Sequence, residues 1–227
     1  MEVLHGTQNE LEEEAVSLIA TEITRLDSVV LGLVSGRSVR GLYEKLYSAD
    51  IDWSKVHIFM VDERCVPVTS EESNFHTTYE GFLRGLVNEG KLPEENIHEY
   101  HFEEIHDDSC LQKYNEEFEK FGRHFDIVIL SAGEDGHIAS LFPNHVSIKN
   151  EEERFIEVDR APKAPARRIT AARKLLENAD MGMLLFFGEQ KRKAFQKFQD
   201  DRINVIECPA KIAYKMREAY ALRDLTE

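Results

Sequence analysis

Four short apolar runs, separated by segments of helical periodicity, constrain the fold of this chain most strongly. They are rich in β-branched and aliphatic residues and are too short for typical buried helices, so they indicate strands that are covered on both faces. The runs are Ser28–Val34, Val56–Val61, Phe125–Leu130 and Met181–Phe187. Buried strands that alternate with helices predict an α/β protein with a mainly parallel sheet.

Helical spacing of apolar residues predicts the elements between these strands, and together they favour a three-layer α/β sandwich whose Rossmann-like sheet is covered by helices on both faces. The expected helices are Glu10–Leu26, Val39–Tyr47, Phe75–Leu86, Ser109–Phe121, Ala172–Asn178, Gln190–Phe198 and a terminal Ala210–Leu222. Two shorter strands are expected at Phe155–Val158 and Asn204–Glu207. No linker-like stretch divides residues 1–227, so we expect one domain.

The charge balance excludes some classes of partner. A net charge of -15 argues against nonspecific nucleic-acid binding, which needs a basic surface. An anionic substrate would need a local basic pocket in this acidic protein.

The three cysteines are widely spaced and lack a CxxC pair, which predicts reduced thiols rather than disulfides or a zinc site. No apolar stretch is long enough to cross a bilayer, and the first residues lack a signal pattern. We therefore expect a cytoplasmic protein without a membrane partner, and a monomer, because no apolar stripe suggests a subunit contact. We expect no metal site, and His98, His101 and His106 are interpreted as surface or structural residues.

The loop after Phe125–Leu130 carries the strongest chemical signal. Asp135 and His137 stand there beside Gly133 and Gly136. A carboxylate and an imidazole are suited to proton transfer near neutral pH, and ligands bind at the carboxyl ends of parallel strands. His137 is either a catalytic base or a histidine that only forms structural hydrogen bonds, and its place favours catalysis.

Two further loops follow strands and reach the same edge of the sheet. Gly36, Arg37 and Ser38 lead from the first strand into a helix, which makes either an ordinary turn or an anion site. The charged residues Asp62–Arg64 follow the second strand and form either a surface ion cluster or part of a binding site.

Additional positive charge comes from later in the chain. Arg167 and Arg168 follow a proline-bearing segment, and Lys191 lies at the start of a helix. Guanidinium and ammonium groups at these places suit phosphate binding, although any one of them could be a solvated surface residue.

Taken together, these motifs resemble the 6-phosphogluconolactonase family, which is related to the glucosamine-6-phosphate deaminases. The matching segments are Asp62–Pro67 with Ser73-Asn74, Gly133–Pro143, Pro162-Lys163, Arg167–Thr170 and Gly188-x-x-Lys191. The resemblance implies hydrolysis of 6-phospho-D-glucono-1,5-lactone without a metal or an organic cofactor.

The resemblance also implies roles for individual residues. His137 would activate water as a general base, Asp135 would orient its ring, and Asp62 and Arg64 would complete the catalytic group. The phosphate would be bound by Gly36, Arg37 and Ser38, by one or both of Arg167 and Arg168, and by Lys191.

Two alternatives are open. A glucosamine-6-phosphate deaminase would carry a ring-opening glutamate where this chain has Phe142, and phenylalanine cannot transfer a proton. A non-catalytic sugar-phosphate-binding protein is suggested by the first loop, where Val39 replaces the family's usual proline and Arg37 adds a cation. The presence of both Asp135 and His137 favours the lactonase.

Overall fold

The computed structural model describes residues 1–103 and 109–225, and His106 lies outside them. Its strands are β1 (Glu2–His5), β2 (Val29–Leu33), β3 (Val56–Met60), β4 (Asp62–Arg64), β5 (Ile97–His98), β6 (Ile127–Ser131), β7 (Phe155–Val158), β8 (Arg168–Ala171), β9 (Met181–Phe186) and β10 (Glu218–Arg223). Its α-helices are α1 (Gln8–Arg25), α2 (Arg40–Ser48), α3 (Asn74–Thr78), α4 (Arg84–Asn88), α5 (Ser109–Glu119), α6 (Arg173–Glu177) and α7 (Arg192–Gln199).

The main sheet runs in the order β1-β10-β9-β6-β2-β3-β5, and each adjacent pair is parallel. From β2 the chain continues to β3 on one side, whereas β6 is followed by β9 and β10 on the other. The strand order therefore reverses between β2 and β6. Loops that leave these two strands diverge and open a crevice at their carboxyl ends, which is where such sheets bind ligands.

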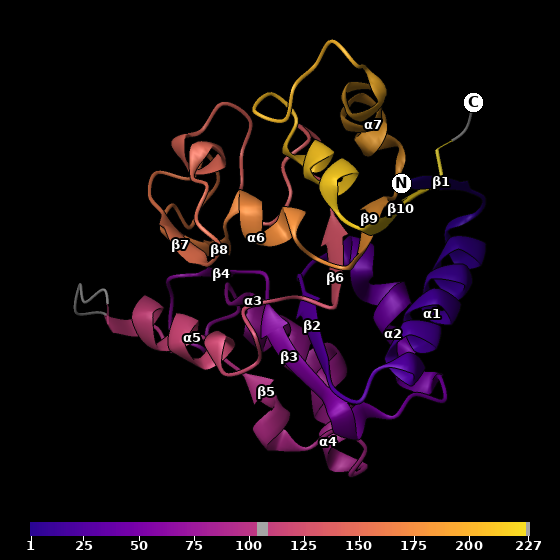
Figure 1. Ribbon diagram of the computed structural model, residues 1–227, viewed down its shortest axis with the longest axis vertical. Coiled ribbons are helices and arrows are strands. Elements are labelled where there is room, and N and C mark those ends of the chain that lie inside the picture. Colours follow the sequence, from indigo (N-terminus) through magenta and orange to yellow (C-terminus); the bar gives the residue numbers. More distant parts are fainter. Residues whose placement is uncertain (104–108, 226–227) are drawn as a thin grey trace.

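Helices cover both faces of this sheet, which confirms the predicted three-layer α/β class (Figure 1). On one side α5 packs through Tyr114 and Phe118 against Phe59 of β3. On the other, α1 and α2 contact each other. The α1 helix begins at a capping box in which Thr7 and Glu10 exchange hydrogen bonds. All residues of β9 are buried, as expected for a strand between two helical layers.

A second, smaller sheet of antiparallel strands, β4-β8-β7, stands beside the main one (Figure 1). Only its β7 strand was expected from the sequence. Residues Asp62–Arg64 are not a simple loop: they form β4 and pair with β8, so that Arg64 stands opposite Arg168. This pairing brings the second charged motif and the basic segment together.

The C-terminal expectations were wrong. Asn204–Glu207 is a turn region rather than a strand, and Ala210–Leu222 is not one helix. A 3-10 segment, Pro209–Lys215, is followed by β10, which pairs with both β9 and β1. The alanines in this stretch favour a helix locally, but two neighbouring strands offer backbone hydrogen bonds and burial that outweigh the local preference.

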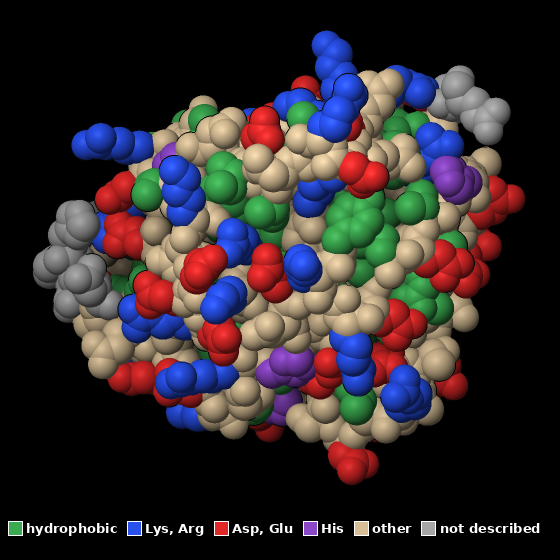
Figure 2. Space-filling view, turned by 45° about the horizontal axis from the view of Figure 1, so that its top comes forward, with side chains coloured by type: hydrophobic (Ala, Val, Ile, Leu, Met, Phe, Trp, Pro, Cys, Tyr) green, Lys and Arg blue, Asp and Glu red, His purple; other side chains and the backbone are tan. Residues whose placement is uncertain are grey.

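The described surface carries charges of both signs. On the face shown in Figure 2, Lys and Arg side chains are interspersed with Asp and Glu, so this face presents no continuous basic surface. Within residues 1–103 and 109–225, no helix has the length and apolar character needed to cross a membrane.

Candidate active site

A cavity of about 260 Å³ lies at the carboxyl ends of β2 and β6, where the strand order reverses. Its walls come from the loop after β2, from β4 and α3, from the loop after β6, and from two later segments that contain Lys163 and Lys191. All predicted catalytic and phosphate-binding positions except Asp135 and Arg167 line it, and Asp135 contacts the lining residue His137. The three loops predicted to share one site are therefore brought together.

A larger cavity, of about 630 Å³, lies beside α3 and α5 and includes His98 and Glu117 in its wall. It is away from the carboxyl ends of β2 and β6. The smaller cavity is the better candidate because its polar side chains converge from separate loops.

The His137 ring is held against the loop that carries it. Its Nδ1 lies 2.5 Å from Asp135 Oδ1, and its backbone N–H donates to the same oxygen at 3.1 Å. On another side the ring is 4.9 Å from that of Phe142, which is 1% exposed. In the tautomer that donates Nδ1–H to the Asp135 carboxylate, a neutral imidazole offers Nε2 as a proton acceptor, as a general base requires.

The two glycines of this loop have different structural roles. Gly136 has a φ of 96°, a conformation that side chains disfavour. Gly133 has no positive φ, but a Cβ there would lie 2.0 Å from His137 Cε1 and 2.0 Å from Nδ1. The missing side chain of Gly133 therefore makes room for the imidazole, a role that the sequence pattern did not reveal.

The contact with His137 keeps Asp135 charged. Burial raises the pKa of the Asp135 carboxyl, but the hydrogen bonds and charge of His137 outweigh burial and hold that pKa well below its ordinary value. Lys163 lowers it further through its positive charge. The carboxylate can therefore fix the orientation of the imidazole throughout the neutral pH range.

Residues of β4 alternate between the cavity and the protein interior. Asp62 and Arg64 line the cavity, whereas Glu63 accepts hydrogen bonds from Ser73 Oγ and the N–H groups of Asn74 and Phe75 at the start of α3. Burial raises the pKa of Glu63, although these donors oppose the shift. Glu63 thus ties α3 to β4, a positioning role that the charge run alone did not indicate.

Arg64 and Asp62 are partly engaged by the protein. One Nη1 hydrogen of Arg64 is donated to the Glu72 carbonyl at 2.5 Å, while its buried Nε has no hydrogen-bond partner among the described residues. Asp62 Oδ2 accepts from Ser140 Oγ at 2.6 Å. An unpaired buried N–H beside a cavity is available to a ligand atom that carries negative charge.

Positive charge comes from two walls of the cavity. Gly36, with a φ of 126°, Arg37 and Ser38 form one wall, and Lys191 Nζ donates to the Ala132 carbonyl on the other. Burial lowers the pKa of Lys191; the negative charges of Glu134 and Asp135 oppose this shift, and the positive charges of Lys163 and Arg37 add to it. Such a group of cations suits an anion.

The two adjacent arginines occupy different places. Arg168 is 5% exposed and lines the cavity. Arg167 instead forms an ion pair with Glu157 and does not line the cavity. The alternation of a strand separates them, since Arg168 is the first residue of β8.

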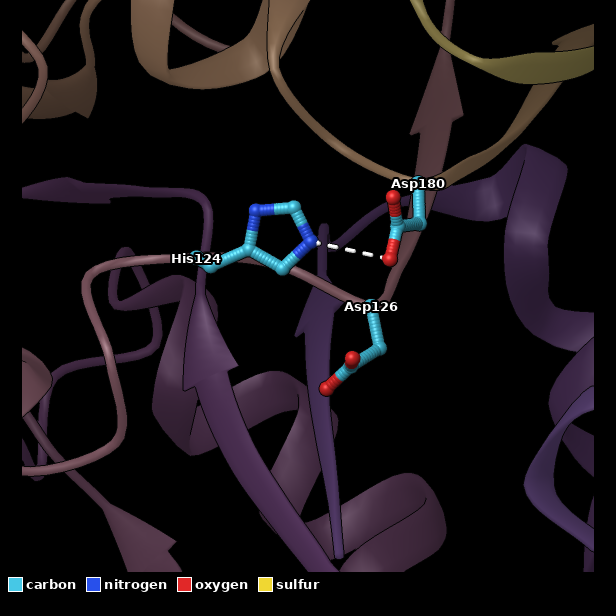
Figure 3. A group of neighbouring side chains, drawn as sticks. All are labelled: His124, Asp126 and Asp180. Carbon is cyan, nitrogen blue, oxygen red and sulfur yellow. Dashed lines mark ion pairs between the residues drawn. The ribbon is translucent and has the colours of Figure 1, made fainter. Parts of the chain in front are cut away.

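Within residues 1–103 and 109–225, one group of potential metal ligands lies close together: His124, Asp126 and Asp180 (Figure 3). It stands at the amino ends of β6 and β9, opposite the cavity. His124 pairs with Asp180 at 3.1 Å, Arg217 contacts the same carboxylate, and Asp126 accepts the Val30 N–H at 2.7 Å. These contacts fasten neighbouring strands.

Comparisons with known proteins agree with this architecture. Residues 5–221 match the family described as glucosamine-6-phosphate isomerases/6-phosphogluconolactonase. The 6-phosphogluconolactonase of Borreliella burgdorferi is 30% identical over 213 residues, which cover 93% of this chain and 91% of that protein. The 6-phosphogluconolactonase of Thermotoga maritima is 31% identical over 180 residues, covering 78% of this chain and 79% of that protein.

Solved structures show the same fold. The crystal structure of the Thermotoga maritima 6-phosphogluconolactonase superposes with a TM-score of 0.80 at 24% identity, covering 97% of this chain and 98% of that one. A monomeric glucosamine-6-phosphate deaminase superposes with a TM-score of 0.83 at 18% identity, covering 99% and 97%. The fold is thus common to both kinds of enzyme, and the site residues must distinguish between them.

Proposed function

Because the chain belongs to the glucosamine-6-phosphate isomerase/6-phosphogluconolactonase family, we propose that it hydrolyses 6-phospho-D-glucono-1,5-lactone to 6-phospho-D-gluconate. The observation that carries this proposal is the His137–Asp135 pair beside a cavity that also holds Arg37 and Lys191. A base and two cationic side chains that line one cavity match the chemistry of a phosphorylated lactone.

His137 activates the attacking water. Its Nε2 accepts a proton from water as the oxygen attacks the lactone carbonyl, and Asp135 holds the ring and offsets the positive charge that it acquires. General-base assistance of this kind contributes about 10²–10⁴-fold. When the tetrahedral intermediate collapses, the ring C–O bond breaks, and the imidazolium can return the proton to the leaving alkoxide.

Arg64 stabilises the negative charge that develops on the carbonyl oxygen. Its Nε–H, which is buried without a partner among the described residues, is the donor available for this oxygen. One carboxylate oxygen of Asp62 accepts the hydrogen bond from Ser140 Oγ, and the other oxygen accepts a hydrogen bond from a sugar hydroxyl. No step in this sequence requires a metal or an organic cofactor.

The phosphate binds between the Gly36–Ser38 loop and Lys191. Backbone N–H groups of a glycine-containing turn and two cationic side chains are complementary to a phosphate dianion. Holding this remote group places the lactone carbonyl near His137, and a misplacement of about 1 Å would cost about 10²-fold in rate. Arg167, paired with Glu157, is not assigned to phosphate binding.

The deaminase alternative receives no support from Phe142. This residue is 1% exposed and packs against His137 and the Arg168 guanidinium, so no carboxylate occupies that place. Hydrolysis of an activated ester needs only a base and a stabilised oxyanion, both of which the site provides.

Hydrolysis of freshly generated lactone tests the proposal, with spontaneous opening as the baseline. We expect the wild type to accelerate hydrolysis and His137→Ala to lose this acceleration. His145→Ala is the matched control, because the His145 ring contacts that of Phe142 but does not line the cavity. Acceleration that survives in His137→Ala would refute the mechanism. A wild type that releases ammonia from glucosamine 6-phosphate would indicate the deaminase, and sugar-phosphate binding without turnover of either substrate would indicate a binding protein.

We further propose that the enzyme is a cytoplasmic monomer. Among the described residues, the large apolar side chains that are exposed are Met1, Val146 and Tyr214, which supports a surface without a large apolar contact. Cys65, Cys110 and Cys208 are free thiols, which supports a reducing compartment. Light scattering would test the monomer, and a stable dimer would overturn it.

A further inference from the structure

The Arg168 guanidinium is almost fully occupied by its own protein. Its Nε donates to the Pro165 carbonyl at 2.9 Å, and its Nη2 donates to the carbonyls of Lys163 and Ala164 at 3.1 and 3.3 Å. Its Nη1 donates to Ser140 Oγ at 3.4 Å. A guanidinium has five N–H donors, so these four bonds leave one, which cannot form the two-pronged contact that arginine usually makes with phosphate.

The carbonyls that Arg168 binds belong to three consecutive residues, 163–165. These residues lie in a loop that is also closed by a hydrogen bond from the Ala161 N–H to the Ala166 carbonyl at 2.8 Å. On its other side Arg168 is anchored by Ser140, which donates to Asp62. Arg168 therefore links the 163–165 loop, through Ser140, to Asp62 in the β4 wall of the cavity.

Lys163 is the cationic side chain that this loop presents to the cavity. It lines the wall together with Arg37 and Lys191, and its ammonium forms no ion pair with the described residues. Its positive charge lowers the pKa of both Asp135 and Lys191, so Lys163 lies within electrostatic reach of both groups.

We propose that Lys163 is a further phosphate ligand that sets the preference for a phosphorylated lactone, and that the buried Arg168 is the positioning residue that holds it in place. This inference rests on the proposed function and extends its phosphate site. A lysine has a long, flexible stem, and fixing its backbone reduces the entropy lost when its ammonium meets the substrate. Glu134 and Asp135 offset part of the positive charge of Arg37, Lys163 and Lys191, and a phosphate dianion would neutralise the remainder.

The first test compares 6-phosphogluconolactone with unphosphorylated glucono-1,5-lactone in wild type and Lys163→Met. We expect the ratio of kcat/KM for the phosphorylated over the unphosphorylated lactone to fall about tenfold to a hundredfold, as for the loss of one hydrogen bond to a charged group. Lys193→Met is the matched control, since Lys193 is an exposed lysine outside the cavity wall. An unchanged ratio in Lys163→Met would overturn the proposal.

A double-mutant cycle tests whether Arg168 acts through Lys163. Arg168→Gln alone should lower the same ratio, mainly through a higher KM for the phosphorylated lactone. Adding Arg168→Gln to Lys163→Met should lower the ratio little further. Independent, multiplicative losses would show that Arg168 contacts the substrate directly and would overturn the positioning role.

Calorimetric binding separates this inference from the proposed reaction. If Lys163 contacts phosphate, Lys163→Met should weaken binding of 6-phosphogluconate about tenfold or more and leave the weaker binding of gluconate nearly unchanged. A wild type that hydrolyses neither lactone but shows this loss of affinity would refute the reaction and retain the ligand role. Equal affinities of wild type and Lys163→Met for 6-phosphogluconate would refute the ligand role, whatever the rate of hydrolysis.

Discussion

Replacing Gly133 with alanine tests how closely catalysis depends on the position of one imidazole. The added Cβ would lie 2.0 Å from both Cε1 and Nδ1 of His137 and 2.8 Å from its Cγ. An ordinary contact needs at least 3.4 Å, so the ring must move by about 1.4 Å. Such a movement is incompatible with the 2.5 Å contact between Nδ1 and Asp135.

The expected effect of Gly133→Ala is a loss of rate without a loss of fold. Gly133 has no positive φ, so alanine suits the backbone. A displacement of about 1 Å in a catalytic group costs about 10²-fold, and we expect kcat/KM for the lactone to fall by about that factor or more. The melting temperature should change little, because the ring can turn toward the open cavity.

Gly81→Ala is the matched control. A Cβ at Gly81 meets no heavy atom within 4 Å, so this variant should keep full activity and gain up to about 1 kcal/mol of stability from reduced freedom of the unfolded chain. Steady-state hydrolysis and thermal unfolding of both variants would be measured side by side. Wild-type activity in Gly133→Ala would refute the assignment of His137, as positioned here, to the catalytic step.

Three other perturbations follow from the contacts described above. Asp135→Asn keeps the size of the side chain but removes its charge, so we expect kcat in the lactone assay to fall at least about tenfold, with binding of 6-phosphogluconate retained; an unchanged kcat would contradict the role of Asp135. Burial lowers the pKa of His98 to about 4, so the contribution of His98 to the free energy of unfolding should be greatest above about pH 6.5 and decline as the pH falls toward 4. Urea titrations across this range would measure the decline, and His98→Phe should make the curve flatter than in wild type. Phe118→Ala removes a ring that is 1% exposed and packs on Phe59 and Phe125, and it should lower the free energy of unfolding in urea by about 3–5 kcal/mol; a loss under 1 kcal/mol would mean that the core collapses around the gap.

The local sequence pattern was sufficient to predict a secondary-structure element where burial and periodicity agree. The apolar runs that contain β2, β3, β6 and β9 were recognised as strands because each lies between two helical layers and is apolar on both faces. Parallel pairing then brings their loops to one edge, so the motifs at Arg37, Asp62 and His137 could be predicted to meet. The cavity confirms that they do. Their roles in catalysis and phosphate binding remain predictions.

Pairing with distant strands determined the conformation and the neighbours of segments that the local sequence pattern could not predict. The alanine-containing segment of β10 favours a helix by propensity, yet it forms a strand because it pairs with β1 on one side and with β9 on the other. Likewise, the charges of Asp62–Arg64 do not reveal that β8 pairs with them, and this antiparallel pairing is what carries Arg168 to the cavity and leaves Arg167 with Glu157.

The amino-acid sequence by itself determined the α/β class, the loops that carry chemistry and the His137–Asp135 pair, because these depend on periodicity and on neighbours in the chain. Only the tertiary structure decided which charges reach the cavity. It brought Glu63 to the start of α3 and placed Gly133 against the His137 ring. It also brought the Arg168 guanidinium to the backbone carbonyls of residues 163–165. The reason is physical: a hydrogen bond or steric contact between distant residues depends on where the fold places both partners, and no local pattern encodes that placement.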